Sequence, residues 1–248
     1  MSAEPACFAG LWSALTADRD PFGVPVTGEV PAICLNMVVS VDGATTIGGR
    51  VGALTGPVDQ ALLYRLRAEA DAVLVGAQTV RTEGYRHLLR PEDRHRRTRE
   101  RGSAEPLLCV VSGRLALPDG SPALGEAPSP LVFLTSSEAP LPRAARPVAA
   151  IRSDGASPAG ALRLRPLLRR LREEFRVERI VCEGGSTLNE ALFAEGLVRE
   201  MFVSLSPLLA QQAVSPKLVA GDAQPVPLEL VAHAASEDFV FLRYRGRD

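Results

Sequence analysis

Short apolar runs of strand length alternate with helix-like stripes through most of the chain. The run Ala32–Val41 is almost continuously apolar, which is typical of a strand buried on both faces of a sheet. Residues 57–70 carry a helical stripe that begins with Pro57 at the first turn. In residues 162–175, leucines fall on one face and arginines on the other, which indicates a surface helix of an α/β layer.

The C-terminal part has a different pattern, with three strand-like runs and little helix between them. This change predicts an α/β fold with a mixed, mostly parallel sheet, helices on both faces and antiparallel strands at the C-terminal end. We expect one domain over residues 30–248, preceded by an extended arm, residues 1–29, that is rich in Pro, Asp and Gly. The predicted strands after the first are residues 71–76, 106–112, 130–135, 180–182, 199–209, 228–236 and 239–245.

Composition excludes several classes of function. The chain has 248 residues, a net charge of −1 and 23% charged residues, so nothing global indicates binding to nucleic acid or to an acidic membrane. No apolar run approaches the ~20 residues of a membrane span. The N-terminal residues lack the basic-then-apolar layout of a signal peptide, and we expect a cytoplasmic protein.

Cysteine and histidine spacing gives no indication of a metal site. Cys7, Cys34, Cys109 and Cys182 form no C-x-x-C pair, and the last three lie in apolar runs where buried free thiols are expected. The histidines, at positions 87, 95 and 233, have no ligand-like spacing, so we expect no bound metal.

The stretch Ile180–Phe193 reads as a buried strand that ends at Glu183, Gly184 and Gly185 and then becomes a helix. Glycine lets the backbone approach another group closely. A helix N-terminus offers unpaired amides and a partial positive charge, so the stretch is a candidate phosphate site. The alternative is that Thr187–Glu190 forms a capping box, which would only close the helix.

Three stretches in order, Ser40–Gly49, Leu66–Gly84 and Glu183–Leu209, carry a family resemblance. Together they resemble the reductase half of the bacterial bifunctional riboflavin-pathway deaminase-reductases, whose fold is like that of dihydrofolate reductase. The resemblance runs from about Ala32 to about Tyr244. Because the sequence contains no H-x-E with a downstream P-C-x-x-C, we expect a reductase domain without the deaminase half.

The resemblance implies that NADPH lies across the carboxyl ends of the strands, where loops from several strands can surround one ligand. Amides at the start of the helix after Gly185 would hold its pyrophosphate. The residues implied to contact the cofactor are Val39, Ser40, Thr55, Gly56, Gly76, Thr79, Gly184, Gly185, Ser186, Thr187 and Leu188.

The resemblance also implies a substrate, 5-amino-6-(5-phosphoribosylamino)uracil, whose ribosyl group is reduced to ribityl by hydride transfer to an imine-like carbon. Glu83 and Asp42 are the candidate catalytic acids. The candidate substrate-binding residues are Arg67, Arg90 and Glu183. The resemblance implies that both arginines contact the substrate and that Arg90 pairs with its phosphate, which suits the arginine fork. Glu183 is a further acid at the predicted cleft.

The sequence departs from the family pattern at positions that touch substrate. Glu83 stands where the family commonly has Asp, and residues 83–90 read EGYRHLLR in place of D-P-x-L-T-x-R. Residues 51–53, Val-Gly-Ala, replace the usual Ser-x-Trp. Two alternatives therefore remain: a pterin or dihydrofolate-like reductase of the same fold, and a nucleotide-binding protein without turnover.

Two further expectations concern surfaces. Homologous reductases are usually homodimers built on the β-rich edge, and residues 199–209 with the C-terminal strands could supply that surface. The arginine-dense segment 86–102 is expected to be a solvated loop; the alternatives are a nucleic-acid patch, which no aromatic residues support, and a contact to the adenosine 2′-phosphate.

Overall fold

A nine-stranded sheet forms the centre of the computed structural model, which describes residues 4–17, 19–23, 28–153, 162–212, 215–221 and 224–247. The strands are β1 Ala32–Ser40, β2 Ala72–Gly76, β3 Leu107–Val111, β4 Leu131–Thr135, β5 Val148–Arg152, β6 Arg179–Cys182, β7 Val198–Ser206, β8 Leu228–Ser236 and β9 Phe239–Gly246. The helices are α1 Phe8–Thr16, α2 Pro57–Glu69, α3 Ala77–Glu83, α4 Pro91–Arg101, α5 Leu164–Phe175 and α6 Ser186–Ala194, with a 3₁₀ turn at Pro122–Leu124.

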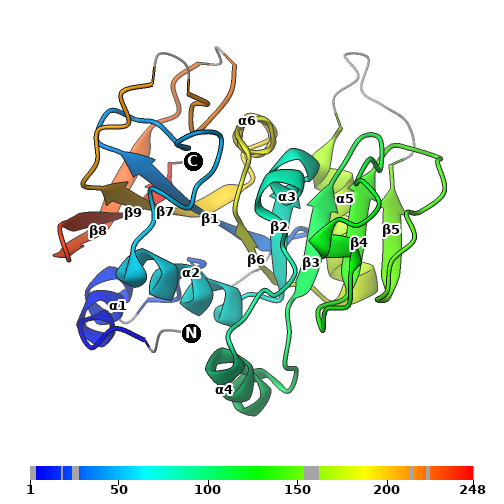
Figure 1. Ribbon diagram of the computed structural model, residues 1–248, viewed down its shortest axis with the longest axis horizontal. Coiled ribbons are helices and arrows are strands. Elements are labelled where there is room, and N and C mark those ends of the chain that lie inside the picture. Colours follow the sequence, from blue (N-terminus) through cyan, green and yellow to red (C-terminus); the bar gives the residue numbers. More distant parts are fainter. Residues whose placement is uncertain are drawn as a thin grey trace.

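The order of strands across the sheet is β5-β4-β3-β2-β6-β1-β7-β9-β8 (Figure 1). Every pair from β5 to β7 is parallel, whereas β9 pairs antiparallel with both β7 and β8. The predicted mixed sheet with antiparallel C-terminal strands is confirmed. The sequence pattern did not single out β5, a short strand at one edge of the sheet.

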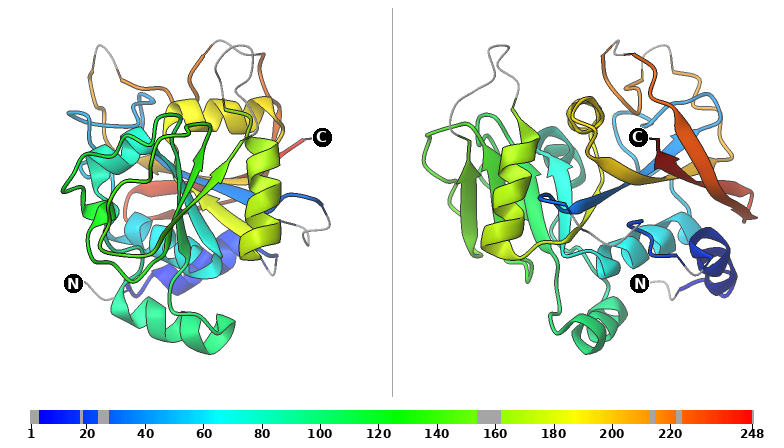
Figure 2. Two further views of the ribbon diagram at one scale, coloured as in Figure 1. Left: turned by 90° about the vertical axis from the view of Figure 1, so that its right-hand side faces the viewer. Right: turned by 180° about the vertical axis from the view of Figure 1, so that it is seen from behind.

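Helices cover both faces of the sheet, as expected (Figures 1 and 2). Alternate residues of β1 point to opposite sides, so Cys34 and Val38 join a core with α1, α2 and α3. Ile33 and Leu35 join a second core with α5 and α6. The run that predicted β1 is continuously apolar because both faces of the strand are buried, as expected.

The expectation of an extended N-terminal arm is wrong for residues 8–16, which form α1. Phe8, Leu11 and Leu15 are buried in the core shared with α2. The guanidinium of Arg243 donates hydrogen bonds to the carbonyls of Leu15 (3.2 Å) and Asp20 (2.7 Å), which ties this segment to β9. The proposed domain boundary at residue 30 stays a prediction.

The expectation of a solvated arginine-rich loop is also wrong, because residues 91–101 form α4. Arg97 is buried and donates to the carbonyls of Ala68 (2.9 Å) and Ala70 (2.5 Å), so it closes the C-terminal end of α2. Burial lowers the pKa of Arg97 to about 10. Buried Asp93 pairs with Arg96 (3.0 Å). These arginines stabilise the fold through buried hydrogen bonds and ion pairs. The high number of arginines in the sequence does not by itself indicate this role.

Cys34, Cys109 and Cys182 are buried free thiols, as predicted, whereas Cys7 is free but exposed. Burial raises the pKa values of Cys109 and Cys182 to about 12, so both stay protonated and behave as small apolar residues. In the described part of the chain, no helix has the length and apolar character needed to cross a membrane.

Candidate functional site

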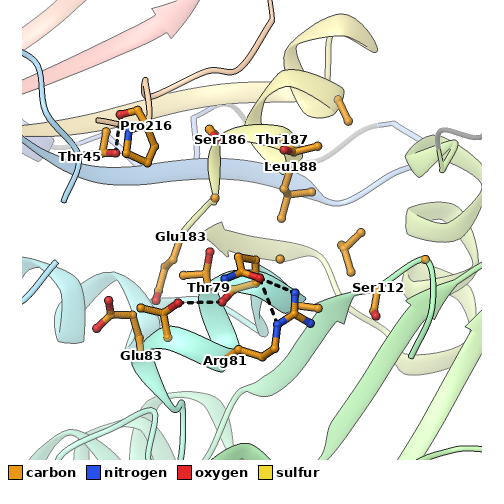
Figure 3. A pocket seen from close by; sticks show the side chains of 18 of the residues that line it. Thr45, Thr79, Arg81, Glu83, Ser112, Glu183, Ser186, Thr187, Leu188 and Pro216 are labelled. Carbon is orange, nitrogen blue, oxygen red and sulfur yellow. Dashed lines mark hydrogen bonds between the residues drawn. The ribbon is translucent and has the colours of Figure 1, made fainter. Parts of the chain in front are cut away.

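A cavity of about 1280 Å³ opens over the carboxyl ends of β2, β3, β4 and β6 (Figure 3). We call it the cleft. Because parallel strands end at the same edge of the sheet, the residues that follow them meet there. Its polar and glycine lining residues include Thr45, Thr46, Gly49, Gly76, Gln78, Thr79, Arg81, Thr82, Glu83, Ser112, Gly113, Arg114, Ser136, Glu183, Gly185, Ser186, Thr187, Gln212 and Lys217.

The glycine pair before α6 brings three backbone segments together. Gly184 has a φ of 78°, which favours glycine, and its carbonyl accepts a hydrogen bond from the N–H of Gly76 (2.8 Å). A Cβ added to Gly185 would lie 3.0 Å from Oγ1 of Thr79, so a side chain there would push against α3. The glycines therefore let the loop after β6 lie directly against the start of α3.

The N-terminus of α6 faces the cleft with its first amides uncapped. Its N-cap is Gly185, which makes no side-chain hydrogen bond to the helix. The alternative capping box at Thr187–Glu190 does not form, since Thr187 lies inside the helix. Ser186, Thr187 and Leu188 all line the cleft, and free amides at a helix N-terminus favour an anion there.

Glu183 lies at the centre of a buried polar cluster behind the cleft. Arg67 binds it with two parallel hydrogen bonds, from Nε to Oε1 (2.6 Å) and from Nη2 to Oε2 (2.7 Å). The hydroxyl of Tyr85 also donates to Oε2 (2.7 Å). The third Arg67 contact is to the carbonyl of Leu88 (3.1 Å). Only Glu183 of this cluster lines the cleft, so Arg67 and Tyr85 hold its carboxylate in place.

The charges of this cluster follow from its burial and its pairing. Burial by itself lowers the pKa of Arg67, but the adjacent Glu183 carboxylate raises it above its ordinary value. Burial, reinforced by Glu183, raises the pKa of Tyr85 well above its usual range. At neutral pH the arginine is therefore charged and the phenol is a neutral hydrogen-bond donor.

Glu83 lines the cleft at the end of α3, and Figure 3 shows its side chain directed toward the same part of the cleft as Glu183. Its Oε1 accepts a hydrogen bond from the N–H of Val51 (3.1 Å). This contact joins α3 to the loop in which Val-Gly-Ala replaces the family's Ser-x-Trp. The two departures from the family pattern therefore touch each other.

The structure does not bring Asp42 into the cleft. Its exposed carboxylate accepts hydrogen bonds from the Ser40 hydroxyl and from the N–H groups of Ala210 (3.0 Å) and Gln211 (2.9 Å). These bonds, the Ser40 bond first, lower its pKa to about 2. Asp42 thus joins the loops after β1 and β7 as a permanent anion, which does not suit a proton donor.

Several other predicted residues do not line the cleft. Arg90 pairs with Asp93 (2.8 Å) and stacks over Tyr64, with 4.8 Å between its guanidinium carbon and the ring centroid. The hydroxyl of Thr55 donates to Asp59. The predicted residues that do not line the cleft are Val39, Ser40, Asp42, Thr55, Gly56, Arg67, Arg90 and Gly184.

The sequence interpretation missed several residues of this region. Ser112 is the last residue of one predicted strand and Ser136 follows another, so the strand-end rule that selected Gly76 could have found them. Nothing in the sequence marks buried Asp59 as unusual, because acidic residues are common in the first turn of a helix. Burial raises the pKa of Asp59, although the Ser204 and Thr55 hydroxyls oppose this.

A mixed sheet of this order, with parallel strands, an antiparallel C-terminal pair and helices on both faces, is a dihydrofolate-reductase-like fold, and a large cleft lies over its parallel strand ends. Residues 31–238 match the family described as the RibD C-terminal domain. The chain therefore belongs to this family, as its three motifs indicated.

Relatives and solved structures agree with this assignment. A protein of Methanothermobacter thermautotrophicus named 2,5-diamino-6-ribosylamino-4(3H)-pyrimidinone 5′-phosphate reductase is 29% identical over 219 residues, 85% of this chain and 96% of its own. A protein of the same name from Archaeoglobus fulgidus is 29% identical over 77% of this chain and 87% of its own.

Among solved structures, a pyrimidine reductase-like protein of Corynebacterium diphtheriae superposes with a TM-score of 0.72 at 22% identity, covering 91% of this chain and 96% of its own. The riboflavin biosynthesis reductase Rib7 of Saccharomyces cerevisiae gives a TM-score of 0.65 at 16% identity, covering 96% of this chain and 98% of its own. At these identities the likeness supports the fold.

Proposed function

We propose that this chain is a nicotinamide-dependent reductase that converts the ribosyl group of a phosphorylated aminopyrimidine to a ribityl group. The archaeal relatives are named as reductases of such a compound, and the matches to them cover 85% and 77% of this chain. The observation that carries the proposal is the cleft itself, with an uncapped helix N-terminus beside two glutamates.

The residues of the cleft fit a dinucleotide. The amides of Ser186, Thr187 and Leu188 would bind its diphosphate, and Gly185 lets the loop before them lie against Thr79 of α3. The reduced nicotinamide, when bound, supplies the hydride. We propose NADPH over NADH because Arg114 lines the cleft and its guanidinium could pair with a 2′-phosphate. None of the α4 arginines lines the cleft, so they do not serve this role.

The reduction needs one hydride at the imine carbon and one proton at the imine nitrogen. We propose that Glu83 holds the proton, since it lines the cleft and its other contact is a single backbone N–H. Glu183, fixed by Arg67 and Tyr85, would orient the substrate by accepting its N–H or O–H groups. Arg90 would reach the substrate phosphate only by leaving Asp93, so its role stays a prediction.

The heterocycle distinguishes two substrates. The archaeal relatives are named for the 2,5-diamino-pyrimidinone, the compound before deamination, whereas the bacterial resemblance implies the uracil after it. We propose the uracil, and the assay should offer both compounds and dihydrofolate, with NADPH and NADH, while following loss of the reduced nicotinamide. Oxidation only with dihydrofolate would favour the pterin alternative, and binding without oxidation would favour the non-catalytic one.

Two variants connect the assay to the site. Gly185→Val places a side chain against Thr79, 3.0 Å from where its Cβ would lie, and should weaken cofactor binding at least tenfold. Glu83→Gln should lower kcat roughly a hundredfold and leave the cofactor Kd unchanged. If both variants bound cofactor and turned over as the unchanged protein does, the site assignment would be wrong.

A homodimer and a cytoplasmic location stay proposals. β7 lies inside the sheet between β1 and β9, so residues 199–206 cannot form the edge surface expected of them. The edge strand at the C-terminal end of the sheet is β8, and Leu230 on it is 49% exposed. Sedimentation of the unchanged protein and of Leu230→Glu would test this surface, since a charge there should separate the two chains.

A further inference from the structure

Lys217 is the only lysine of the chain, and it lines the cleft. The segment that carries it, residues 215–221, has no regular secondary structure but is fixed at three points. Oγ1 of Thr45 donates to the carbonyl of Pro216 (2.8 Å), and Nδ2 of Asn189 donates to that of Leu218 (2.7 Å). Lys217 therefore stands between two anchored carbonyls.

The same segment lies against the first turn of α6. The N–H of Ala220 donates to the carbonyl of Ser186 (3.2 Å), and Asn189, which holds Leu218, belongs to α6. Figure 3 shows Pro216 and Thr45 on the same side of the cleft as Ser186. The lysine is thus attached next to the uncapped amides of Ser186, Thr187 and Leu188.

Charge balance calls for a cation at this place. A diphosphate carries about two negative charges, whereas a helix N-terminus supplies roughly half a positive charge. Among the described residues, the cations that line the cleft are Arg81, Arg114 and Lys217. Arg81 is engaged, because its guanidinium donates to the Ala116 carbonyl (2.7 Å) and to Gln78.

Arg114 lies farther along the sheet from α6 than the Lys217 segment, which bonds to Ser186 directly. It follows β3, whereas α6 follows β6, and β2 lies between those two strands. Neighbouring strands are about 4.8 Å apart, so the two strand ends are separated by roughly 10 Å. Lys217 makes no ion pair with any described carboxylate, so its ammonium is available to a ligand.

We infer that Lys217 is the cation that binds the diphosphate of the nicotinamide dinucleotide, opposite the first amides of α6. The inference rests on the proposed function and names a residue that the family motifs did not single out. The ammonium would act as a mobile point charge, while the amides of α6 give the fixed hydrogen bonds.

Chemical modification tests this without any substitution. The chain has two kinds of primary amine, the α-amino terminus and Lys217, so limited acetylation followed by peptide mass spectrometry reports each separately. Saturating NADPH should protect Lys217 at least fivefold and leave the α-amino group unchanged. Equal acetylation of Lys217 with and without bound NADPH would overturn the inference.

Substitution gives the second measurement. Lys217→Met should raise the Kd for NADPH and for NADH by about tenfold, the effect of one charge-assisted contact open to solvent, and Lys217→Arg should restore most of it. The Kd for adenosine 2′-monophosphate, which has no diphosphate, should not change. Arg172→Met, which removes a charge on α5, is the matched control.

The outcomes separate this inference from the proposed function. If the unchanged protein bound no reduced dinucleotide, both would fall. If it bound and oxidised NADPH while Lys217→Met kept the same Kd, only the role of Lys217 would fall. A loss of affinity for adenosine 2′-monophosphate equal to that for NADPH would move the lysine away from the diphosphate and overturn the assignment.

Discussion

Among the described residues, two arginine–glutamate pairs are almost fully buried, and the shortest distances within them are similar. Arg67 binds Glu183 at 2.6 Å, and Arg243 binds Glu200 at 2.9 Å. The Arg67 and Glu183 side chains are 9% and 6% exposed, and those of Arg243 and Glu200 are 0% and 1% exposed. By distance and burial alone, neither pair is marked as functional.

Their surroundings differ completely. Glu183 follows the last residue of β6 and lines the cleft, so one side of the pair meets the space where a ligand would lie. Glu200 lies inside β7 and faces the N-terminal segment, where a Cβ on Gly23 would lie 3.1 Å from its Oε1. Its second partner is Arg245 (2.9 Å), and Arg243 donates to the carbonyl of Leu15 near the end of α1.

The comparison teaches that a buried ion pair by itself does not mark an active site. What distinguishes the two pairs is where the strand carrying the glutamate ends relative to the cleft. A carboxylate in mid-strand can only stabilise packing, whereas one just past the strand end can also contact a ligand. The two pairs should therefore respond differently to the loss of one partner.

The largest effect on stability is expected from Glu200→Gln. The substitution keeps the size of the side chain but leaves the fully buried Arg243 without its carboxylate, which should cost about 3–5 kcal/mol of unfolding free energy. Denaturant titration measures this.

Arg245→Met, which removes the 31% exposed outer partner, should cost less than about 1 kcal/mol and serves as the control. Cofactor affinity of the folded Glu200→Gln protein should be unchanged. If both variants lost the same unfolding free energy, buried Arg243 and partly exposed Arg245 would not differ in their contribution to stability.

Arg67→Met should have the opposite effect: a smaller loss of stability than Glu200→Gln and a larger loss of activity. Water in the cleft can solvate the released Glu183 carboxylate, so the stability loss should be smaller, about 1–3 kcal/mol. The loss of a fixed, charged hydrogen-bonding group should lower kcat/KM for the pyrimidine roughly a hundredfold. Steady-state kinetics and denaturant titration on one preparation measure both. Arg67→Lys keeps the charge but not the fork and should recover stability better than activity. If Arg67→Met lost stability as severely as Glu200→Gln with normal turnover, both pairs would be structural.

The sequence could predict which segments form strands and where those strands end, because both depend on the periodicity of apolar residues. Ile180–Cys182 was identified as a strand and Glu183 as its end, so the position of Glu183 at the sheet edge followed. The strands around it were predicted for the same reason, because continuous apolar runs and helical stripes report burial directly.

The sequence could not predict pairings between distant segments. Arg67 and Glu183 are 116 positions apart, and Arg243 and Leu15 are 228 apart, and no local pattern encodes such contacts. The local sequence pattern predicts an arm where α1 forms and a loop where α4 forms. It misses both helices because the partners that stabilise them lie on other elements. Asp42 and Arg90 were placed in the site by motif order, and their carboxylate and amide partners became visible only in the fold.

The smallest effect is expected from Tyr85→Phe, which removes a partner that only the cleft pair possesses. Phenylalanine keeps the ring, whose centroid lies 5.5 Å from the guanidinium carbon of Arg67, and both Arg67–Glu183 hydrogen bonds remain. The loss of one hydrogen bond to a carboxylate should cost about 1–2 kcal/mol, with kcat/KM reduced severalfold and the cofactor Kd unchanged.

The pH dependence of stability distinguishes this positioning role from simple packing. Because burial and Glu183 raise the pKa of Tyr85 in the folded protein, the stability that its hydroxyl contributes is complete below the usual phenol pKa of about 10. It is lost as the pH rises above that value toward the pKa in the folded protein, since the unfolded chain ionises first. The stability difference between the unchanged protein and Tyr85→Phe should therefore shrink above pH ~10, as denaturant titrations at several pH values would show. A difference that stayed constant through this range would mean that the hydroxyl is not held in the buried contact with Glu183, and the cleft pair would then differ from the core pair only in its position.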